Sequence, residues 1–193
     1  MRVWVIRHGE SETNRDGLWT GWLDVPLTEK GREDAVAVRR VLSGVQFDKI
    51  YTSDLQRAKT TAQIAIPGCQ FEQKPIIREI NVGNLAGKPL SAVMDQDNRP
   101  RNLDDYGRFG GETKEAFSDR VATFMHSLES EDCENIAVFS HGGFLRKFLD
   151  LAVGTELPWE RICCKNCAVA IFEYDNSVWQ LHSWINKVIE CIS

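Results

Sequence analysis

The sequence has no long hydrophobic run and no large excess of either charge. Its apolar stretches are only a few residues long, whereas a helix needs about 20 mostly apolar residues to cross a bilayer, so we expect no membrane-spanning segment. Lysine and arginine together number 23 and aspartate and glutamate 28, which gives a net charge of -5. Such a chain has no overall attraction for nucleic acid or for an anionic membrane surface, so any anion site must be a local cluster of basic residues.

The first residues also lack the apolar stretch and the cleavage site of a secretory signal peptide. We therefore expect a cytoplasmic protein whose six cysteines are reduced. Three of them form the segment Cys163-Cys164-x-x-Cys167, but a fourth zinc ligand is not present at a suitable spacing. Packed thiols are the expected state here, and a metal site is the alternative.

The length and the pattern of elements predict one α/β domain over residues 1–193. A chain of 193 residues, 42% apolar and 26% charged, is the size of a single domain. Apolar runs predict strands and helical periodicity predicts helices between them, which favours a three-layer α/β/α sandwich with a mostly parallel central sheet. The expected strands are 3–6, 48–52, 135–139 and a hairpin of 167–174 with 178–184, and the expected helices are 28–42, 113–128 and 144–153.

Two local signals concern the segments that follow the first two strands. Residues 9–27 contain Gly, Asn, Asp and Pro at short intervals and indicate a long ordered loop, a kind of segment that is usually functional in compact domains. Ser53 and Gln56 have the spacing of a capping box, in which each side chain accepts a hydrogen bond from the backbone of the other. This pattern predicts a helix that starts at Ser53 and has Arg57 in its first turn.

The chain has only four histidines, and two of them share an unusual context. His8 and His141 each follow a predicted buried strand and each precede a glycine. Ligands of parallel sheets bind beyond the C-terminal ends of the strands, so the two imidazoles are candidates for one site. A single histidine in such a place is more often a hydrogen-bonded structural residue, and it is the coincidence of two that favours a site. His126 and His182 have no such context and are predicted to be structural.

Arginines close to these histidines in the predicted fold suggest the chemistry. The guanidinium groups of Arg7 and Arg57 match the oxygens of a phosphate group, and an imidazole can attack phosphorus without help from a metal ion. The glycine after each histidine lets the backbone approach an anion closely. Arg7, Arg57, His8 and His141 together would form a phosphate site that contains a nucleophile.

Four ordered motifs resemble those of the histidine phosphatase superfamily, also called the phosphoglycerate mutase-like family. Together they cover about residues 1 to 185. The sequence R-H-G-E-S at 7–11, followed by Asn14, resembles the first signature, and residues 20–28 resemble the stretch after it. Residues 53–58 resemble the S-x-L-x-R-A segment, 78–80 the acid-bearing segment, and 140–143 the second histidine turn.

The resemblance implies a role for each matching residue. His8 would be the nucleophile that forms a phosphohistidine, and Arg7, Arg57 and His141 would bind the transferring phosphoryl group. Glu79 would protonate the leaving group and then activate water; this role rests on the resemblance, and Glu10 and Glu112 are the rival acids. The residues expected to contact the substrate are Asn14, Thr20, Gly21 and Gly142.

Chain length separates the two main activities of this family. Only 61 positions lie between Glu79 and His141, and this short spacing resembles the phosphatases, whereas the glycolytic mutases are longer there. We therefore expect a metal-independent phosphatase that needs no cofactor and acts on a small phosphorylated metabolite. Residues 21–24 also resemble the mutases, so a phosphoglycerate mutase is one alternative, and a non-catalytic protein that binds a phosphorylated ligand is another.

The sequence leaves two features open. The loop from Asn98 to Gly111 carries Arg99, Arg101 and Arg108, which could close over an acidic substrate or form a solvated loop whose charge is offset by nearby aspartates. The oligomeric state is also open, with a homodimer among the assemblies allowed.

Overall fold

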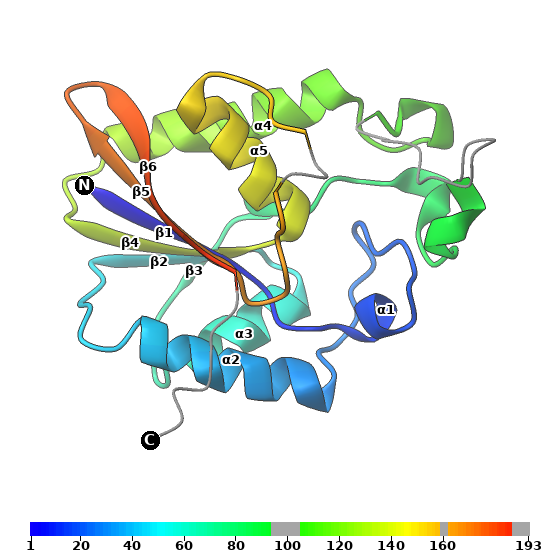
Figure 1. Cartoon of the computed structure of the whole chain (residues 1–193), viewed down its shortest axis with the longest axis horizontal. Coiled ribbons are helices and arrows are strands. Elements are labelled where there is room, and N and C mark those ends of the chain that lie inside the picture. Colours follow the sequence, from blue (N-terminus) through cyan, green and yellow to red (C-terminus); the bar gives the residue numbers. More distant parts are fainter. Residues whose placement is uncertain (94–104, 159–161, 187–193) are drawn as a thin grey trace.

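A computed structural model describes residues 1–93, 105–158 and 162–186, and a six-stranded sheet lies at the centre of this part of the chain (Figure 1). The strand order is β3-β2-β4-β1-β5-β6. The first four strands run parallel, and β5 and β6 add an antiparallel hairpin at one side. The strands are β1 (Arg2–Arg7), β2 (Lys49–Thr52), β3 (Glu72–Gln73), β4 (Asn135–Ser140), β5 (Val169–Asp175) and β6 (Val178–Ile185).

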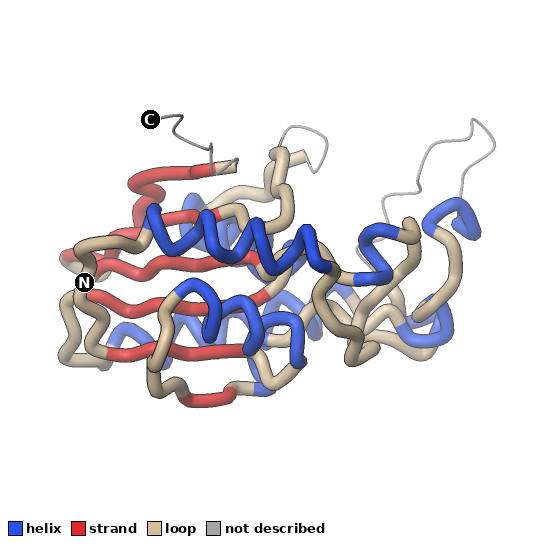
Figure 2. The backbone as a smooth tube through the Cα atoms, turned by 90° about the horizontal axis from the view of Figure 1, so that it is seen from below, coloured by secondary structure: helices blue, strands red, loops and turns tan. Residues whose placement is uncertain are grey.

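Helices cover both faces of this sheet. In Figure 1, α4 (Lys114–Glu129) and α5 (Gly142–Val153) lie above the strands, and α2 (Glu29–Val41) and α3 (Gln56–Ala65) lie below them. The view from below in Figure 2 accordingly shows helices in front of the strands. The predicted three-layer α/β/α sandwich and the parallel centre of the sheet are confirmed.

The apolar pattern of β1 and β4 explains why both strands are central. Side chains of successive strand residues point to opposite faces, so a strand that is buried on both faces is apolar at successive positions through its middle. Val5 of β1 packs in the core under α4 and α5, whereas Ile6 packs in the core over α2 and α3. Val138 and Phe139 of β4 divide between the same two cores.

Threonine caps begin two of the helices, and a glycine ends a third. The side chain of Thr28 accepts a hydrogen bond from Gly31 N–H and begins α2, and Thr113 does the same for α4. The helix expected at 144–153 begins two residues earlier, at Gly142, with His141 as its N-cap, and it ends at Gly154 in the left-handed conformation.

The expected capping box at Ser53 and Gln56 is wrong. Helix α3 begins at Gln56 with Leu55 as its N-cap, and Leu55 offers no side-chain hydrogen bond. The Gln56 N–H donates instead to Asp24 Oδ1 at 2.7 Å, while Ser53 Oγ accepts from Leu55 N–H. The cap thus comes from a loop residue far away in the sequence. Arg57 lies in the first turn of α3, as expected.

The loops gather at the C-terminal ends of β1, β2 and β4, at the right in Figure 1. The expected loop 9–27 contains a short helix, α1 (Glu12–Arg15), which Ser11 and Asn14 cap reciprocally. The remaining described connections include 3-10 helices at Pro75–Ile77, Gly83–Leu85, Leu90–Val93 and Gly107–Phe109. Of the arginine-bearing loop, Arg99 and Arg101 lie outside the described residues, and Arg108 stacks on the ring of Phe109. Among the helices of the described ranges, none has the length and apolar character needed to cross a bilayer.

Candidate active site

The two histidines that follow the central strands lie side by side. Strands β1 and β4 are parallel neighbours, and their last residues, Arg7 and Ser140, are paired. The residues that follow, His8 and His141, therefore emerge at the same edge of the sheet. The centroids of the His8 and His141 rings are 5.1 Å apart. Both residues are buried. The sheet register therefore brings these two predicted site residues together.

Hydrogen bonds define the state of the His8 ring. Its Nδ1 lies 2.6 Å from the carbonyl oxygen of Gly9, and a carbonyl only accepts, so Nδ1 carries the proton and Nε2 the lone pair. Arg57 Nε donates to Nε2 at 3.3 Å. Burial, together with the charges of Arg57 and Arg7, holds the pKa of His8 well below its usual value. His8 is therefore a neutral imidazole with a defined tautomer.

Arg57 is fully buried and its guanidinium is fixed by backbone carbonyls. Nη1 donates to Leu23 O at 2.6 Å and Nη2 to Gly21 O at 2.8 Å, which turns Nε toward His8. Gly21 has a φ of +49°, and a Cβ there would lie 2.6 Å from a methyl group of Val82. Glycine at this position thus lets the chain turn so that its carbonyl reaches the arginine.

Arg7 lies beside the start of α5. Its Nη1 donates to the carbonyl of Cys164. A Cβ on Gly142 would lie 3.1 Å from Arg7 Nε, so glycine allows the guanidinium and the helix start to approach each other. Within the described residues, Arg7 Nε is buried and makes no hydrogen bond. This N–H is a donor suited to an anion.

His141 has an unusual environment for a buried polar residue. Its side chain is completely inaccessible, and among the described residues neither ring nitrogen has a hydrogen-bond partner. Burial, followed by the charges of Arg57, His8 and Arg7, holds its pKa well below the usual value. Buried polar atoms without partners are costly in a folded protein and are characteristic of sites that bind a polar ligand.

Glu79, in the segment after Pro75–Ile77, extends its carboxyl to the start of α5. Its Oε2 accepts from Gly143 N–H at 3.0 Å and its Oε1 from Ile80 N–H at 2.9 Å. A Cβ on Gly143 would lie 2.2 Å from Oε1, so the carboxyl occupies the space that a side chain would fill. When this carboxyl is ionised, its charge interacts favourably with that of Arg57.

The two rival acids have structural partners instead. Glu10 accepts a hydrogen bond from Thr28 Oγ1 at 2.8 Å. Glu112 forms a two-pronged ion pair with Arg120, at 2.7 and 2.8 Å. Of the three carboxyls considered, Glu79 is the one held against the start of α5.

The residues expected to contact substrate occupy different positions. Gly21 adjoins Arg57 and Gly142 adjoins Arg7. Asn14 Oδ1 accepts from Ser11 N–H at 3.2 Å and from Asn166 Nδ2 at 3.0 Å. Thr20 shares a hydrogen bond of 2.6 Å with Thr13.

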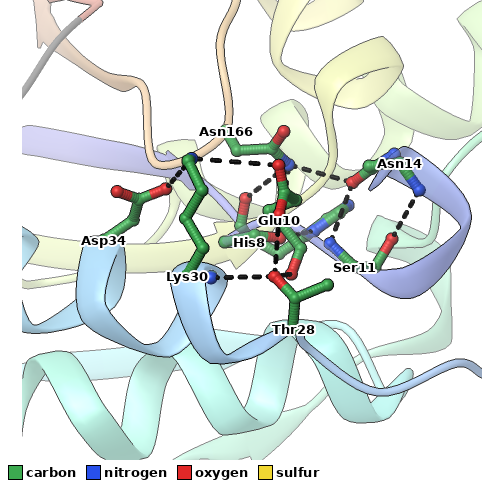
Figure 3. A network of polar contacts seen from close by, with 10 residues as sticks. His8, Glu10, Ser11, Asn14, Thr28, Lys30, Asp34 and Asn166 are labelled. Atoms are coloured by element: carbon green, nitrogen blue, oxygen red, sulfur yellow. Dashed lines mark hydrogen bonds and ion pairs between the residues drawn. The ribbon is translucent and has the colours of Figure 1, made fainter. Parts of the chain in front are cut away.

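Three polar residues near the site were not expected from the sequence. Asn166 donates to the backbone of His8 (Figure 3). Trp22 Nε1 and Arg120 Nη2 both donate to the backbone carbonyl of Glu79, at 2.7 and 3.1 Å. In these three contacts the acceptor is a backbone carbonyl, which every residue has, so no sequence pattern identifies them. The motif at residues 78–80 predicts the acid itself but not the residues that hold its backbone.

The cysteine segment 163–167 runs past the site without forming a metal cluster. The described cysteines are free, and burial raises the pKa of Cys167 to about 12. No group of three or more histidine, cysteine or acidic residues suited to a metal occurs in the ranges that the structure describes. His126 and His182 are exposed and lie away from the site.

Comparisons with known proteins identify the family of this chain. Residues 3–187 match the profile of the histidine phosphatase superfamily (branch 1). The chain is 34% identical over 181 residues to the adenosylcobalamin/alpha-ribazole phosphatase of Escherichia coli K12, covering 89% of each chain. It is 30% identical over 195 residues to the probable phosphoglycerate mutase GpmB of Photorhabdus laumondii, covering 96% of this chain and 90% of that one.

A solved structure shows the same fold. It is that of a putative alpha-ribazole-5'-P phosphatase from Escherichia coli, with a TM-score of 0.80 and 29% identity over 97% of both chains. The resemblance of the four motifs is thereby confirmed over nearly the whole chain. The protein belongs to branch 1 of the histidine phosphatase superfamily.

Proposed function

We propose that the protein is a cytoplasmic phosphatase that hydrolyses small phosphate monoesters through a phosphohistidine at His8 and needs no metal ion. The observation that carries this proposal is the state of His8. Its Nδ1–H is held by Gly9 O, its ring is neutral, and its Nε2 lies 3.3 Å from a buried arginine nitrogen. A neutral imidazole with its lone pair on Nε2, next to donors suited to phosphate oxygens, is a nucleophile for phosphorus.

In the first step, Nε2 of His8 attacks the phosphorus atom and the bond from phosphorus to the ester oxygen breaks. Arg7, Arg57 and His141 donate to the phosphoryl oxygens, whose charge they stabilise in the transition state. Glu79 gives its proton to the departing oxygen, which leaves as an alcohol. The products of this step are the alcohol and a phosphohistidine.

In the second step, the carboxylate of Glu79 accepts a proton from water as the water oxygen attacks phosphorus. The bond between Nε2 and phosphorus breaks, inorganic phosphate leaves, and His8 returns to its neutral form. The N–H groups of Gly143 and Ile80 hold the carboxylate that results from the first step. One carboxyl thus serves as acid and then as base.

A specific observation favours one second candidate, a phosphoglycerate mutase. The relative named probable phosphoglycerate mutase aligns over 96% of this chain. A mutase would form the same phosphohistidine and return the phosphoryl group to a bound phosphoglycerate. The difference lies in whether water or the sugar acid receives the group, so the products distinguish the two activities.

The test uses protein treated with EDTA. Alpha-ribazole 5'-phosphate, for which the relatives are named, and p-nitrophenyl phosphate are assayed for phosphate release. 3-Phosphoglycerate with a trace of 2,3-bisphosphoglycerate is assayed for phosphate and 2-phosphoglycerate together. Phosphate release supports the phosphatase, whereas conversion to 2-phosphoglycerate with little phosphate supports the mutase.

The covalent step is tested by denaturing the protein at alkaline pH, where phosphohistidine survives, and measuring its intact mass. A gain of one phosphoryl group is expected in the wild type. Full turnover by a folded His8→Ala protein would contradict the mechanism. Substrate binding with neither turnover nor a phosphoenzyme would favour the non-catalytic alternative.

A further inference from the structure

Asn166 lies between α5 and β5 and reaches three oxygen atoms around the first histidine turn (Figure 3). Its Nδ2 is 3.2 Å from His8 O, 3.2 Å from Gly9 O and 3.0 Å from Asn14 Oδ1. Backbone carbonyls only accept hydrogen bonds, so the amide nitrogen and not the amide oxygen faces them. The two N–H groups of one side chain are therefore shared among three acceptors.

One of these acceptors also fixes the tautomer of His8. Gly9 O accepts from His8 Nδ1–H at 2.6 Å and from Asn166 at 3.2 Å. Gly9 is held tightly elsewhere as well, because its N–H donates to Thr61 Oγ1 and a Cβ on it would lie 2.3 Å from Gly31 O. Within this fixed turn, Asn166 is a side-chain donor that contacts the same carbonyl as the His8 ring, so it helps to set the direction of the carbonyl and of the imidazole.

The third acceptor sets the orientation of a residue expected to bind phosphate. Asn14 Oδ1 accepts from Ser11 N–H and from Asn166 Nδ2. An amide has its oxygen at one end and its NH₂ group at the other. Since two donors hold the oxygen, the NH₂ group is the end of Asn14 that is left to donate to an anion.

We propose that Asn166 is a positioning residue for phosphoryl transfer, which holds His8 with Nε2 toward the substrate and Asn14 with its NH₂ group toward the phosphoryl oxygens. It does not touch the reacting atoms and acts through these two side chains. The role in transfer rests on the proposed function. The orientation of His8 is a property of the free protein and does not depend on any substrate.

Three variants test this inference. Asn166→Ala removes the donor, and Asn166→Asp keeps the shape but presents a carboxylate to three oxygens. Asn186→Ala is the matched control, because Asn186 Oδ1 accepts from Lys165 N–H at 2.9 Å and so holds the same segment without contacting His8, Gly9 or Asn14. Thermal unfolding of each variant reports whether the fold is retained.

The first measurement is the tautomer of His8 by nitrogen-15 NMR of histidine-labelled protein without substrate. The wild type and Asn186→Ala are expected to show the Nδ1–H form alone, and Asn166→Ala a mixture of tautomers. The second is the rate of phosphohistidine formation in a single turnover with p-nitrophenyl phosphate. Since a displacement of about 1 Å can cost roughly 100-fold in rate, we expect a loss of that order in Asn166→Ala and a larger loss in Asn166→Asp.

Two results would overturn the inference. One is an unchanged His8 spectrum together with an unchanged rate in Asn166→Ala. The other is an equal loss in Asn166→Ala and Asn186→Ala, which would mean that the segment acts only as structural support. A wild-type protein that forms no phosphohistidine would contradict the proposed function instead, and the NMR comparison would then still decide whether Asn166 orients His8.

Discussion

Replacing Gly143 with alanine is expected to displace the proposed acid without unfolding the protein. The new Cβ would lie 2.2 Å from Glu79 Oε1, whereas ordinary contact begins at 3.4 Å, so one of the two groups must move by about 1 Å. The atom encountered is the far end of a flexible side chain, so the carboxyl is the group that moves. The change also disturbs the hydrogen bond of 3.0 Å from Gly143 N–H to Oε2.

The size of the effect follows from these distances. A displacement of about 1 Å in a group that transfers a proton can cost roughly 100-fold in rate. Gly143 lies in the first turn of α5 with an ordinary φ. Alanine is a better helix former than glycine by up to about 1 kcal/mol, so we expect little change in the unfolding temperature.

The assay compares two esters. An alkyl phosphate has a poor leaving group that needs the proton, whereas p-nitrophenolate leaves without it. Gly143→Ala is expected to lose roughly 100-fold on the alkyl ester and much less on the aryl ester. Glu79→Gln, which keeps the size of the side chain and removes the acid, is the comparison variant and is expected to show the same preference. An equal loss on both esters, or no loss on the alkyl ester, would refute the reasoning.

Three further predictions follow from the site and the fold. His8→Ala is expected to abolish phosphohistidine formation, as measured by intact mass, and to leave the circular dichroism spectrum unchanged. His8 and His141 are neutral in the folded state because their pKa values are lowered, so the unfolded chain binds more protons below its histidine pKa of about 6.5. The free energy of unfolding is therefore expected to fall by up to about 1.4 kcal/mol per pH unit for each histidine as the pH drops below that value, and urea titrations between pH 7.5 and 5 that show no such fall would contradict the assignment. Asp24→Ala removes the acceptor of the first N–H of α3 and is expected to lower the unfolding free energy by about 1 kcal/mol, which the same titrations at pH 7.5 measure.

The sequence was sufficient to predict the centre of the fold. Strands β1 and β4 are apolar at successive positions because both of their faces are covered, and this pattern is visible without a structure. Once two such strands are parallel neighbours, the residues that follow them meet. The nearness of His8 and His141 could therefore be expected from the position of each histidine relative to its own strand.

The parts that could not be predicted depend on contacts between distant segments. The start of α3 is capped by Asp24, and a local pattern at Ser53 predicted the wrong cap because it took no account of that loop. The start of α5 was placed too late because Gly142 and Gly143 are poor helix formers, although the site requires both of them to be small. Asn166 was missed because its partners are mainly backbone carbonyls.

The position of β1 between β4 and β5 has a consequence for the order in which the protein folds. Strand β1, which leads into His8, is made before both of its neighbours, which come from residues 135–140 and 169–175. Cys167 N–H, in the segment just before β5, donates to His8 O at 3.1 Å. Contacts between residues so far apart in sequence form slowly, because a long loop must close before they stabilise anything. During synthesis β1 therefore cannot complete its pairing until β5 has emerged, and a chain that stops before residue 169 would leave one edge of β1 without its partner.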